Sequence, residues 1–464
     1  MIKIFNHYFR RHTVLQVLMD LSLVTLAFMV TLVVISDPSA LSAQRLFDGL
    51  LRALWMGFGF LAINAALGFY DSSSVFSATQ LWARALVSLL ATAVNVVAVL
   101  LLFPLPAFYG RTWAVVIVML AITLLLIYQV LVGELLPKAL SPRKVLIYGT
   151  GARAQAVGDT MRRAPSQAEL VGFFASPNEQ EHLVSQWDVL PGQQPLMAFV
   201  KEKGVHEIVV ALSDRRGGSM PMRELLDCKL SGVRVSDIAT FFEQNVGQIR
   251  LDAVSAGWLI FGNGFDQGVI RSATKRVFDI LSALVLIGLT VPLMLVTALL
   301  IKLESSGPVF YRQERVGLFG KTFDVVKFRS MRTDAEKDGV PRWATAADSR
   351  VTRVGRVIRK VRIDELPQLF GVLMGDMSMV GPRPERPYFV DQLVQDIPFY
   401  AVRHSVKPGV TGWAQVSYQY GASREDTIEK LQYDLYYVKN HSLFLDMVIL
   451  FQTVGVVLTG KGAQ

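Results

Sequence analysis

Cysteine is almost absent from this sequence, because Cys228 is the one cysteine among 464 residues. A single cysteine cannot form a disulfide within the chain, and the six histidines do not show the HxxxH spacing of metal ligands. The sequence therefore predicts neither a disulfide framework nor a zinc site of this kind. We expect Cys228 to be a small buried thiol.

Charged residues are also few, at 18% of the chain, whereas hydrophobic residues make up 52%. This composition is too apolar for an ordinary soluble protein, and the length suits two or three domains. We therefore expect a membrane protein with soluble parts. The net charge of +9 suits cytoplasmic surfaces near anionic lipid and also suits phosphate-bearing substrates, so charge alone does not decide between them.

Four apolar windows in the first third of the chain each approach the roughly 20 residues that span a bilayer. They run from Val14 to Ile35, Ala53 to Phe69, Ala85 to Phe103 and Trp113 to Val132. We predict four transmembrane helices within residues 1–135, with both ends in the cytoplasm because basic residues flank the set on each side. Asp20 lies inside the first window near its cytoplasmic end, and we expect it to have a structural role.

Over residues 143–262 short apolar runs alternate with helix-like stretches, a pattern typical of a doubly wound parallel sheet. The first turn reads GTGARA from Gly149 to Ala154, which is the G-x-G-x-x-A form of a dinucleotide fingerprint. No acidic residue ends the second predicted strand, where LVGFF runs into Ala175 and Ser176, and the domain contains no Tyr-x-x-x-Lys motif. The pattern therefore favours a Rossmann-like domain that is nucleotide-free or regulatory over a redox enzyme.

A fifth apolar window runs from Ile280 to Ile301 and contains Pro292. Basic residues stand on both sides of it, so the positive-inside rule assigns both ends to the cytoplasm. Because proline kinks a helix, we predict a re-entrant membrane helix over about residues 277–302 that bends at Pro292 and returns to the same face. The alternative is an ordinary span with a kink, which would put the middle domain and the acidic pair described next on opposite sides of the membrane.

Asp364 and Glu365 stand side by side in the stretch RIDELPQLFGVLMGDMSMVGPRP. Neighbouring helical residues point about 100° apart, so the two carboxylates are suited to separate tasks rather than to sharing one proton. Pro367 is tolerated only in a first helical turn, so we expect Asp364 to cap or open a helix that Gly375 ends. The start of a helix keeps a carboxylate ionised and attracts phosphate.

Arginines accompany the acidic pair on both sides. Upstream of the pair lie Arg350, Arg353, Arg356 and Arg359 at three-residue steps, and then Arg362. The planar guanidinium group suits phosphate oxygens, although a basic helix face on anionic lipid is an equal alternative for any single arginine. Arg359 and Arg362 are nearest the acids, which favours a substrate role for them. Downstream, Arg383 lies between two prolines that fix the shape of its loop.

These residue types together suit phosphoryl transfer. An ionised carboxylate beside phosphate-binding arginines, next to a second carboxylate that can hold Mg²⁺, supports an intermediate of the aspartyl-phosphate type. The cations offset the repulsion between a carboxylate and a phosphate. Because Mg²⁺ keeps several waters while it neutralises a diphosphate, one protein carboxylate is enough to hold it.

Several stretches of the chain resemble one known family. They are KRVFDI at 275–280, GPVFYRQERVG at 307–317, KFRSMRTDAE at 327–336, DELPQL at 364–369, GDMSMVGPRP at 375–384 and KPGVTGWAQ at 407–415. Together they resemble the bacterial polyprenyl-phosphate sugar-1-phosphate transferases over residues 270–464. The preceding part of the chain is similar to the large multispan branch of this family, which is associated with starting exopolysaccharide or O-antigen units. One departure is Gly371, where members usually carry asparagine.

The resemblance implies roles for individual residues. Asp364 would attack the β-phosphorus of a UDP-sugar and release UMP, and Glu365 would hold Mg²⁺. The phosphate of a polyprenyl carrier, undecaprenyl phosphate, would then displace Asp364 and leave a lipid-linked diphosphate sugar with its anomeric configuration unchanged. The residues that would bind the substrate phosphates and nucleotide are Lys327, Arg329, Arg353, Arg359 and Arg383.

The expected fold is that of a membrane protein in three parts. An N-terminal four-helix transmembrane bundle is followed by a cytoplasmic Rossmann-like α/β domain and a C-terminal α/β catalytic domain anchored by the re-entrant helix. The expected partners are a UDP-sugar, undecaprenyl phosphate and the bacterial inner membrane, without nucleic acid, and a homo-oligomer is left open.

Two other functions stay open for this sequence. A glycosyltransferase that breaks the sugar C1–O bond would release UDP, but it normally needs a D-x-D metal motif, which the sequence lacks. A noncatalytic regulator of polysaccharide assembly would need neither Asp364 nor Arg383.

Overall fold

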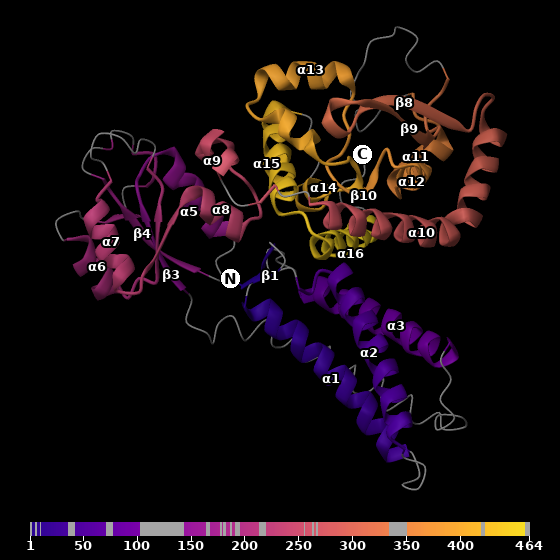
Figure 1. Cartoon of the computed structure of the whole chain (residues 1–464), viewed down its shortest axis with the longest axis horizontal. Helices are drawn as coiled ribbons and strands as arrows, with labels where there is room; N and C mark the ends of the chain where they lie inside the picture. The colour runs from indigo at the N-terminus through magenta and orange to yellow at the C-terminus, as the bar shows by residue number, and fades with distance from the viewer. Residues whose placement is uncertain are drawn as a thin grey trace.

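A computed structural model of the chain shows apolar helices at the N-terminus, a parallel sheet in the middle and a compact α/β unit at the C-terminus (Figure 1). It describes residues 2–4, 7–9, 11–35, 42–70, 78–102, 143–163, 168–176, 179, 182–185, 188–190, 195–212, 220–254, 256–261, 264–265, 268–333, 350–418 and 423–459.

Three N-terminal helices correspond to the first three predicted spans. They are α1 (Arg11–Ile35), α2 (Ala43–Ala66) and α3 (Ala78–Leu102), and α2 lies against both of the others. Together with α10 (Val269–Glu304) they are the four helices, among the described residues, that are long and apolar enough to cross a membrane. The fourth predicted span, Trp113 to Val132, lies outside the described residues.

One contact joins α1 to the segment after α2, and another joins α2 to the C-terminal end of the described chain. Asp20 is buried in α1 and accepts a hydrogen bond from the Tyr70 hydroxyl at 2.8 Å, which is consistent with the structural role expected of it. The apolar helix near the C-terminus, α16 (Leu443–Thr459), packs against α2. The two helices can approach closely because Gly455 has no side chain. A Cβ at this position would lie only 2.1 Å from the Ala66 carbonyl oxygen.

The middle of the chain folds around a five-stranded parallel sheet with the strand order β5-β4-β3-β6-β7. Its elements are β3 (Arg143–Tyr148), α5 (Ala152–Arg163), β4 (Ala168–Phe174), β5 (Val189–Leu190), α6 (Leu196–Lys203), β6 (Glu207–Val210), α7 (Met222–Leu230), β7 (Arg234–Asp237), α8 (Ile238–Asn245), η4 (Leu251–Ala253) and α9 (Ala256–Phe261). Hydrophobic cores lie on both faces of the sheet, as a doubly wound α/β domain requires. Cys228 is buried in one of these cores, as predicted, and burial raises the pKa of its thiol.

The helix α10 has 36 residues and is therefore about 54 Å long at 1.5 Å per residue, well beyond the thickness of a bilayer core. Pro292 lies inside it, and Figure 1 shows the helix running beneath the C-terminal elements and then turning sharply toward β8. Proline removes a backbone donor and its ring crowds the preceding turn, which accounts for the bend. The Thr290 hydroxyl donates to the Leu286 carbonyl at 2.7 Å, so a side chain supports the backbone next to the bend.

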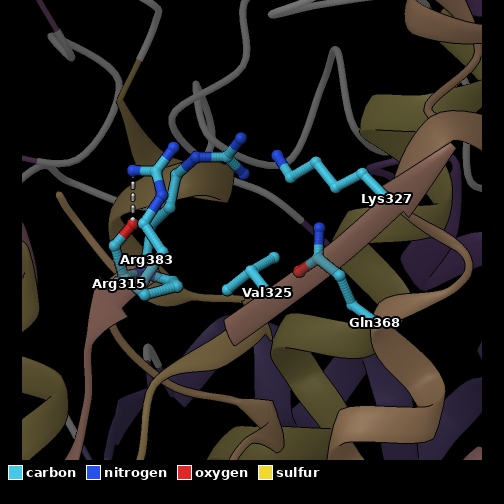
Figure 2. A pocket seen from close by; sticks show the side chains of 6 residues that line it. Arg315, Val325, Lys327, Gln368 and Arg383 are labelled. Carbon is cyan, nitrogen blue, oxygen red and sulfur yellow. Dashed lines mark hydrogen bonds between the residues drawn. The ribbon is translucent and has the colours of Figure 1, made fainter. Parts of the chain in front are cut away.

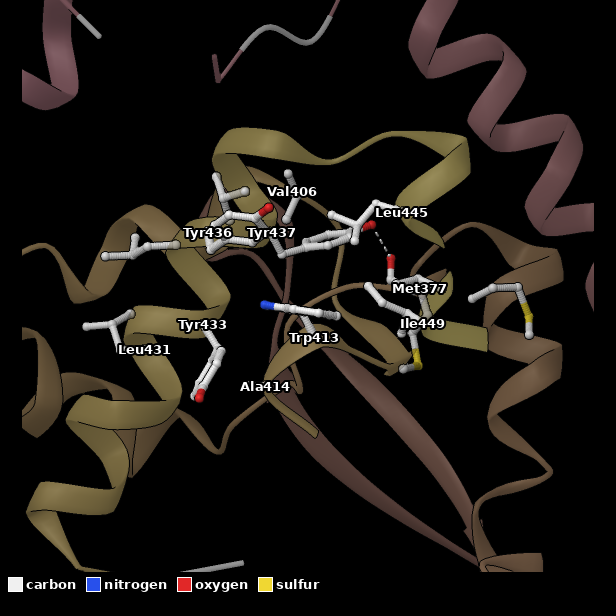
Figure 3. Packing of buried hydrophobic residues seen from close by; sticks show 14 of the residues in the cluster. Met377, Val406, Trp413, Ala414, Leu431, Tyr433, Tyr436, Tyr437, Leu445 and Ile449 are labelled. Atoms are coloured by element: carbon white, nitrogen blue, oxygen red, sulfur yellow. Dashed lines mark hydrogen bonds between the residues drawn. The ribbon is translucent and has the colours of Figure 1, made fainter. Parts of the chain in front are cut away.

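The C-terminal unit is built mostly from short elements around one large core, with a smaller apolar cluster between α10, β9 and α11. They are β8 (Phe310–Val316), η5 (Leu318–Gly320), β9 (Thr322–Phe328), α11 (Arg353–Lys360), η6 (Ile363–Glu365), α12 (Gln368–Met374), β10 (Ser378–Val380), α13 (Pro387–Asp396), η7 (Tyr400–Ser405), β11 (Gly409–Thr411), α14 (Trp413–Ser417) and α15 (Arg424–Asn440). The strands β8 and β9 form an antiparallel hairpin, and β10 and β11 pair in parallel. Figure 3 shows the core, in which Trp413, Tyr436 and Leu445 pack between α14, α15 and α16.

The middle domain and the C-terminal unit are joined through α15. The Lys439 ammonium lies 2.8 Å from the Glu243 carboxylate of α8, and both side chains are only 9% exposed. Asn440 donates to the same carboxylate at 3.2 Å, and the Trp413 indole donates to the Gly247 carbonyl at 2.8 Å. A buried ion pair with further hydrogen bonds is costly to break, so these contacts fix one domain on the other.

Glycines allow β10 and β11 to run close together. A Cβ on Gly409 would lie 2.1 Å from the Gly381 backbone nitrogen, and a Cβ on Gly381 would lie 2.3 Å from the Lys407 carbonyl oxygen. Real Cβ atoms do not approach backbone atoms so closely. The loop that follows β10, which carries Arg383, therefore depends on glycine at this crossing.

We expect Gly409→Ala to destabilise the protein by about 1–3 kcal/mol, because the added methyl group meets backbone atoms that cannot move away easily. The measurement is the midpoint of thermal unfolding of the detergent-solubilised protein. Gly371→Ala is the control, because its Cβ would meet only the Met377 side chain at an ordinary 3.7 Å and alanine favours a helix. Equal midpoints for the two variants would contradict the close crossing.

Candidate active site

The acidic pair lies in the short 3-10 helix η6 (Ile363–Glu365), and both carboxylates are buried there. The residue before this turn, Arg362, adopts a left-handed backbone conformation with φ of 58°, which is uncommon for a residue with a side chain. The helix α12 begins later, at Gln368, so Asp364 does not cap it as the sequence suggested. Gly375 does end α12, with φ of 101°.

Three cations surround the Glu365 carboxylate. Its Oε1 atom lies 2.7 Å from Arg383, 3.2 Å from Lys327 and 3.6 Å from Arg362. Although burial opposes ionisation, Arg383 and Lys327 hold the pKa of Glu365 well below its usual value. Glu365 is therefore ionised at neutral pH and holds together three segments that are far apart in the sequence.

Asp364 has a different environment from its neighbour. Its Oδ1 atom is buried and has no hydrogen-bond partner among the described residues. Burial, together with the negative charge of Glu365, raises the pKa of Asp364 to about 6. The two carboxylates thus have opposite pKa shifts, which is how proteins assign separate chemical tasks to neighbouring acids.

A small pocket opens beside the acidic pair, and Figure 2 shows basic side chains converging on it. Arg315 comes from β8, Lys327 from β9 and Arg383 from the loop after β10. Gln368 at the start of α12 completes the polar lining. Three cations around one opening suit a ligand that carries two phosphate groups, because each phosphate can be bonded and neutralised.

Arg315 is a site residue that the sequence analysis did not select. Arg315 pairs across the hairpin with Phe323. Phe323 and Lys327 lie on the same face of β9, because side chains of a strand alternate with a period of two. Arg315 and Lys327 therefore lie on the same face of the hairpin. The Arg315 guanidinium also donates to the Pro384 carbonyl at 3.1 Å, so it supports the proline-bounded loop. The period-two alternation of side chains along residues 310–328 was the signal in the sequence that could have identified it.

A second residue that the sequence analysis missed is Arg403, which lies buried beneath the same loop. Its guanidinium donates to the backbone carbonyl of Arg383 at 2.9 Å, pairs with the Asp434 carboxylate at 2.8 Å and donates to the Tyr400 hydroxyl at 2.7 Å. A buried guanidinium with this set of partners has a fixed position. Arg403 therefore fixes the backbone from which Arg383 reaches Glu365.

The other predicted phosphate-binding residues lie farther from the acidic pair. Arg329 is buried and donates to the carbonyls of Ser306 and Ser305 at 2.5 and 2.9 Å, just beyond the end of α10. Arg353 and Arg359 both lie on α11, and Arg353 is exposed. Among the described residues, no hydrogen bond or ion pair joins these three side chains to the acidic pair. Their substrate-binding role stays a prediction.

The two end portions of α10 are tied directly to the elements that carry the site. Arg276 donates to the Val372 and Leu373 carbonyls at 2.5 and 2.7 Å, where α12 ends. At the other end, the Glu304 carboxylate accepts from the Arg353 backbone nitrogen at 2.7 Å and so caps α11. The bent apolar helix therefore sets the position of both helices that flank the acidic pair.

The residues present fit a magnesium ion that is held mainly by substrate. Among the described residues there is no cluster of three or more histidine, cysteine or carboxylate ligands of the kind that encloses a structural metal. Mg²⁺ in phosphate-transfer sites is commonly bound by one or two carboxylates and the substrate phosphates. Glu365, which is ionised, and the unpartnered Oδ1 atom of Asp364 supply such oxygens.

Two protein families match separate parts of the chain. The bacterial sugar transferase family matches residues 270–460, which span α10 and the C-terminal unit. A family described as a CoA-binding domain matches residues 65–220, which include most of the parallel sheet.

Individual relatives agree with the first of these families. The chain is 48% identical over 302 residues to the UDP-N-acetylgalactosamine-undecaprenyl-phosphate N-acetylgalactosaminephosphotransferase of Aeromonas hydrophila, covering 65% of this chain and 69% of the relative. It is 34% identical over 328 residues to the UDP-glucose:undecaprenyl-phosphate glucose-1-phosphate transferase of Escherichia coli K12, covering 69% of each. A relative of the latter name in Xanthomonas campestris is 35% identical over 330 residues, covering 69% of this chain and 68% of the relative. The similarity confirms the resemblance seen in the sequence motifs, and the chain belongs to the polyprenyl-phosphate sugar-1-phosphate transferases.

Proposed function

We propose that this enzyme transfers a sugar-1-phosphate from a UDP-sugar to undecaprenyl phosphate through a covalent intermediate on Asp364. The observation that carries the proposal is the buried Oδ1 atom of Asp364, which has no hydrogen-bond partner in the described part of the chain and lies beside a carboxylate held by three cations. A buried acceptor without a partner costs free energy of folding, so its presence in a protein calls for a functional explanation. Bonding to phosphorus is a purpose that fits both the site and the family.

In the first step the Asp364 carboxylate attacks the β-phosphorus of the UDP-sugar. A new oxygen–phosphorus bond forms to Asp364, the bond between the two phosphates breaks, and UMP leaves with the electron pair. Arg315, Lys327 and Arg383 line the pocket where they can neutralise the negative charge on the diphosphate. Asp364 acts as an ionised nucleophile, so no proton needs to be removed from it at neutral pH.

In the second step a phosphate oxygen of undecaprenyl phosphate attacks the same phosphorus. The Asp364 oxygen leaves and is regenerated as a carboxylate, and the product is a lipid-linked diphosphate sugar. Only oxygen–phosphorus bonds change in the two steps, so the configuration at the sugar carbon is retained. When bound, Mg²⁺ would neutralise the diphosphate, with Glu365 as its protein ligand.

The shape of α10 supports placing this chemistry at the membrane surface. Its bend at Pro292 and its apolar exposed face suit a re-entrant helix that enters one leaflet and returns, as basic residues at both ends require. The acidic pair then faces the cytoplasm of the bacterial inner membrane together with the middle domain. A carrier lipid in the leaflet can present its phosphate there, and the product can start an exopolysaccharide repeat unit.

Asp364→Asn should lower UMP release by about a thousandfold or more, because the amide is not a nucleophile toward phosphorus. The assay supplies UDP-N-acetylgalactosamine or UDP-glucose, the donors of the relatives, with undecaprenyl phosphate and Mg²⁺. Asp324→Asn on β9 is the control, because this exposed carboxylate has no predicted role in the reaction. Wild-type turnover by Asp364→Asn, or release of UDP instead of UMP, would contradict the proposal and favour a C1-transferring glycosyltransferase. Absence of any turnover by the wild type with every UDP-sugar supplied would favour a noncatalytic regulator.

The pH dependence of the donor half-reaction should show an acid limb near pH 6. The nucleophile must be ionised, and its pKa in the protein without substrate is raised to about 6. Below that pH, kcat/KM for the UDP-sugar should fall about tenfold for each pH unit as Asp364 becomes protonated. A profile that stays flat through pH 6 and below would argue against ionisation of Asp364 in the first step.

Arg403→Lys should lower kcat by about tenfold or more, because lysine cannot bond the Arg383 carbonyl, Asp434 and Tyr400 at the same time. Lys439→Met is the matched control, because it also breaks a buried ion pair on α15 but one that faces the middle domain. Both variants should lose thermal stability. We expect the control to keep its kcat, and equal loss of kcat in the two variants would show that Arg403 acts on stability alone.

A further inference from the structure

The turn between β3 and α5 carries the dinucleotide fingerprint, but its donor groups are already bonded within the chain. The Glu179 carboxylate accepts from the Thr150 backbone nitrogen at 2.7 Å, from the Thr150 hydroxyl at 3.1 Å and from the Gly151 backbone nitrogen at 3.2 Å. In a nucleotide-binding domain, the backbone N–H groups of this turn and the start of the following helix bind the ligand's pyrophosphate. Here one carboxylate occupies them with both of its oxygens.

The segment after β4 that brings Glu179 to this turn is held in place by other contacts. The His182 ring nitrogen Nδ1 lies 2.8 Å from the Thr150 hydroxyl oxygen. The backbone nitrogens of Leu183 and Val184 donate to the Thr150 carbonyl at 2.9 and 3.4 Å, and the Val184 side chain is buried in the core of the domain. Glu179 and residues 182–184 thus all bond the same turn, and Val184 fixes these contacts to the core of the domain.

Two other positions near the turn also do not suit a dinucleotide: the end of β4 in sequence and Arg153 in the described structure. The strand β4 ends at Phe174 and is followed by Ala175 and Ser176, where a ribose-binding acid would be expected. Arg153, in the first turn of α5, donates to the Leu212 carbonyl at 3.1 Å and to the Asp252 carbonyl. The residues present therefore do not fit the diphosphate of CoA at this turn, although the domain matches a CoA-binding family.

We infer that Glu179 is a built-in substitute for a ligand phosphate, and that the middle domain does not bind a CoA or nucleotide diphosphate at its fingerprint turn. A carboxylate with two oxygens matches the spacing of adjacent N–H donors and the positive end of α5 in the same way as a phosphate does. Tethering makes this carboxylate present at a high effective concentration, so a free anion competes poorly with it. The domain keeps the shape of a nucleotide-binding fold and serves as a docked partner of α15.

Hydrogen–deuterium exchange of the full-length protein in detergent tests this inference locally. In Glu179→Ala, the peptide containing Thr150 and Gly151 should exchange about tenfold faster or more, because two backbone donors lose a charged acceptor. Millimolar inorganic pyrophosphate should restore its protection in the variant. In the wild type, neither pyrophosphate nor CoA should change the exchange of this peptide. Because the readout is confined to the turn, binding of pyrophosphate in the basic catalytic pocket does not affect it.

Glu169→Ala is the control, since Glu169 is an exposed carboxylate on β4 of the same domain, and it should behave as the wild type. The exchange of the peptide over β6 reports whether the domain stays folded. If this peptide loses its protection in Glu179→Ala, the same comparison is made with Glu179→Gln. Three results would overturn the inference. They are unchanged exchange in the Glu179 variant, a loss of protection that pyrophosphate does not restore, and protection of the wild-type turn by pyrophosphate or CoA.

Discussion

The contact of Glu365 with three cations is the interaction on which the candidate active site depends. Lys327, Arg362 and Arg383 come from β9, from the residue before η6 and from the loop after β10, and they meet at one carboxylate oxygen. Without Glu365 these cations would repel one another, and without them two adjacent buried carboxylates could not both ionise. The same contact places an ionised carboxylate, held by three cations, next to Asp364, whose Oδ1 atom has no hydrogen-bond partner among the described residues.

The bent helix α10, which is long and apolar enough to cross a membrane, contacts the elements that carry this group of charges. Arg276 near its start binds the end of α12, and Glu304 at its end caps α11. In its first half, Asp279 is paired with Lys275 and accepts from the Met379 backbone nitrogen at 3.1 Å, next to the proline-bounded loop. The helix α10 thus contacts α11, α12 and β10, which lie around the acidic pair. In the proposed reaction between a soluble donor and a lipid acceptor, such an anchor would hold Asp364 at a constant depth relative to the lipid.

The sequence predicted the described apolar helices and the parallel sheet, because each leaves a local signal. Length and composition identified α1, α2, α3 and α10, and Pro292 accounts for the bend of α10. The start of α12 was placed too early, since the left-handed Arg362 and the 3-10 turn that follows depend on packing and not on helix propensity. Arg403 could not be found from the sequence, because an arginine in RHSVKPG carries no sign that it lies under the loop of Arg383.

The sequence by itself determined the family and which residue types are available for chemistry, because carboxylates, arginines and prolines at fixed spacing limit what a helix or a loop can present. Only the tertiary structure decided which cations act together, since Lys327 and Arg383 are distant in the sequence and meet Glu365 through the pairing of strands and the close crossing at Gly409. The tertiary structure also decided that the N–H groups of the fingerprint turn are bonded to Glu179. The GTGARA motif is the same in sequence whether these groups face a phosphate or a carboxylate. The sequence determines which groups of the chain can donate a hydrogen bond, whereas the fold determines which acceptors these donors meet.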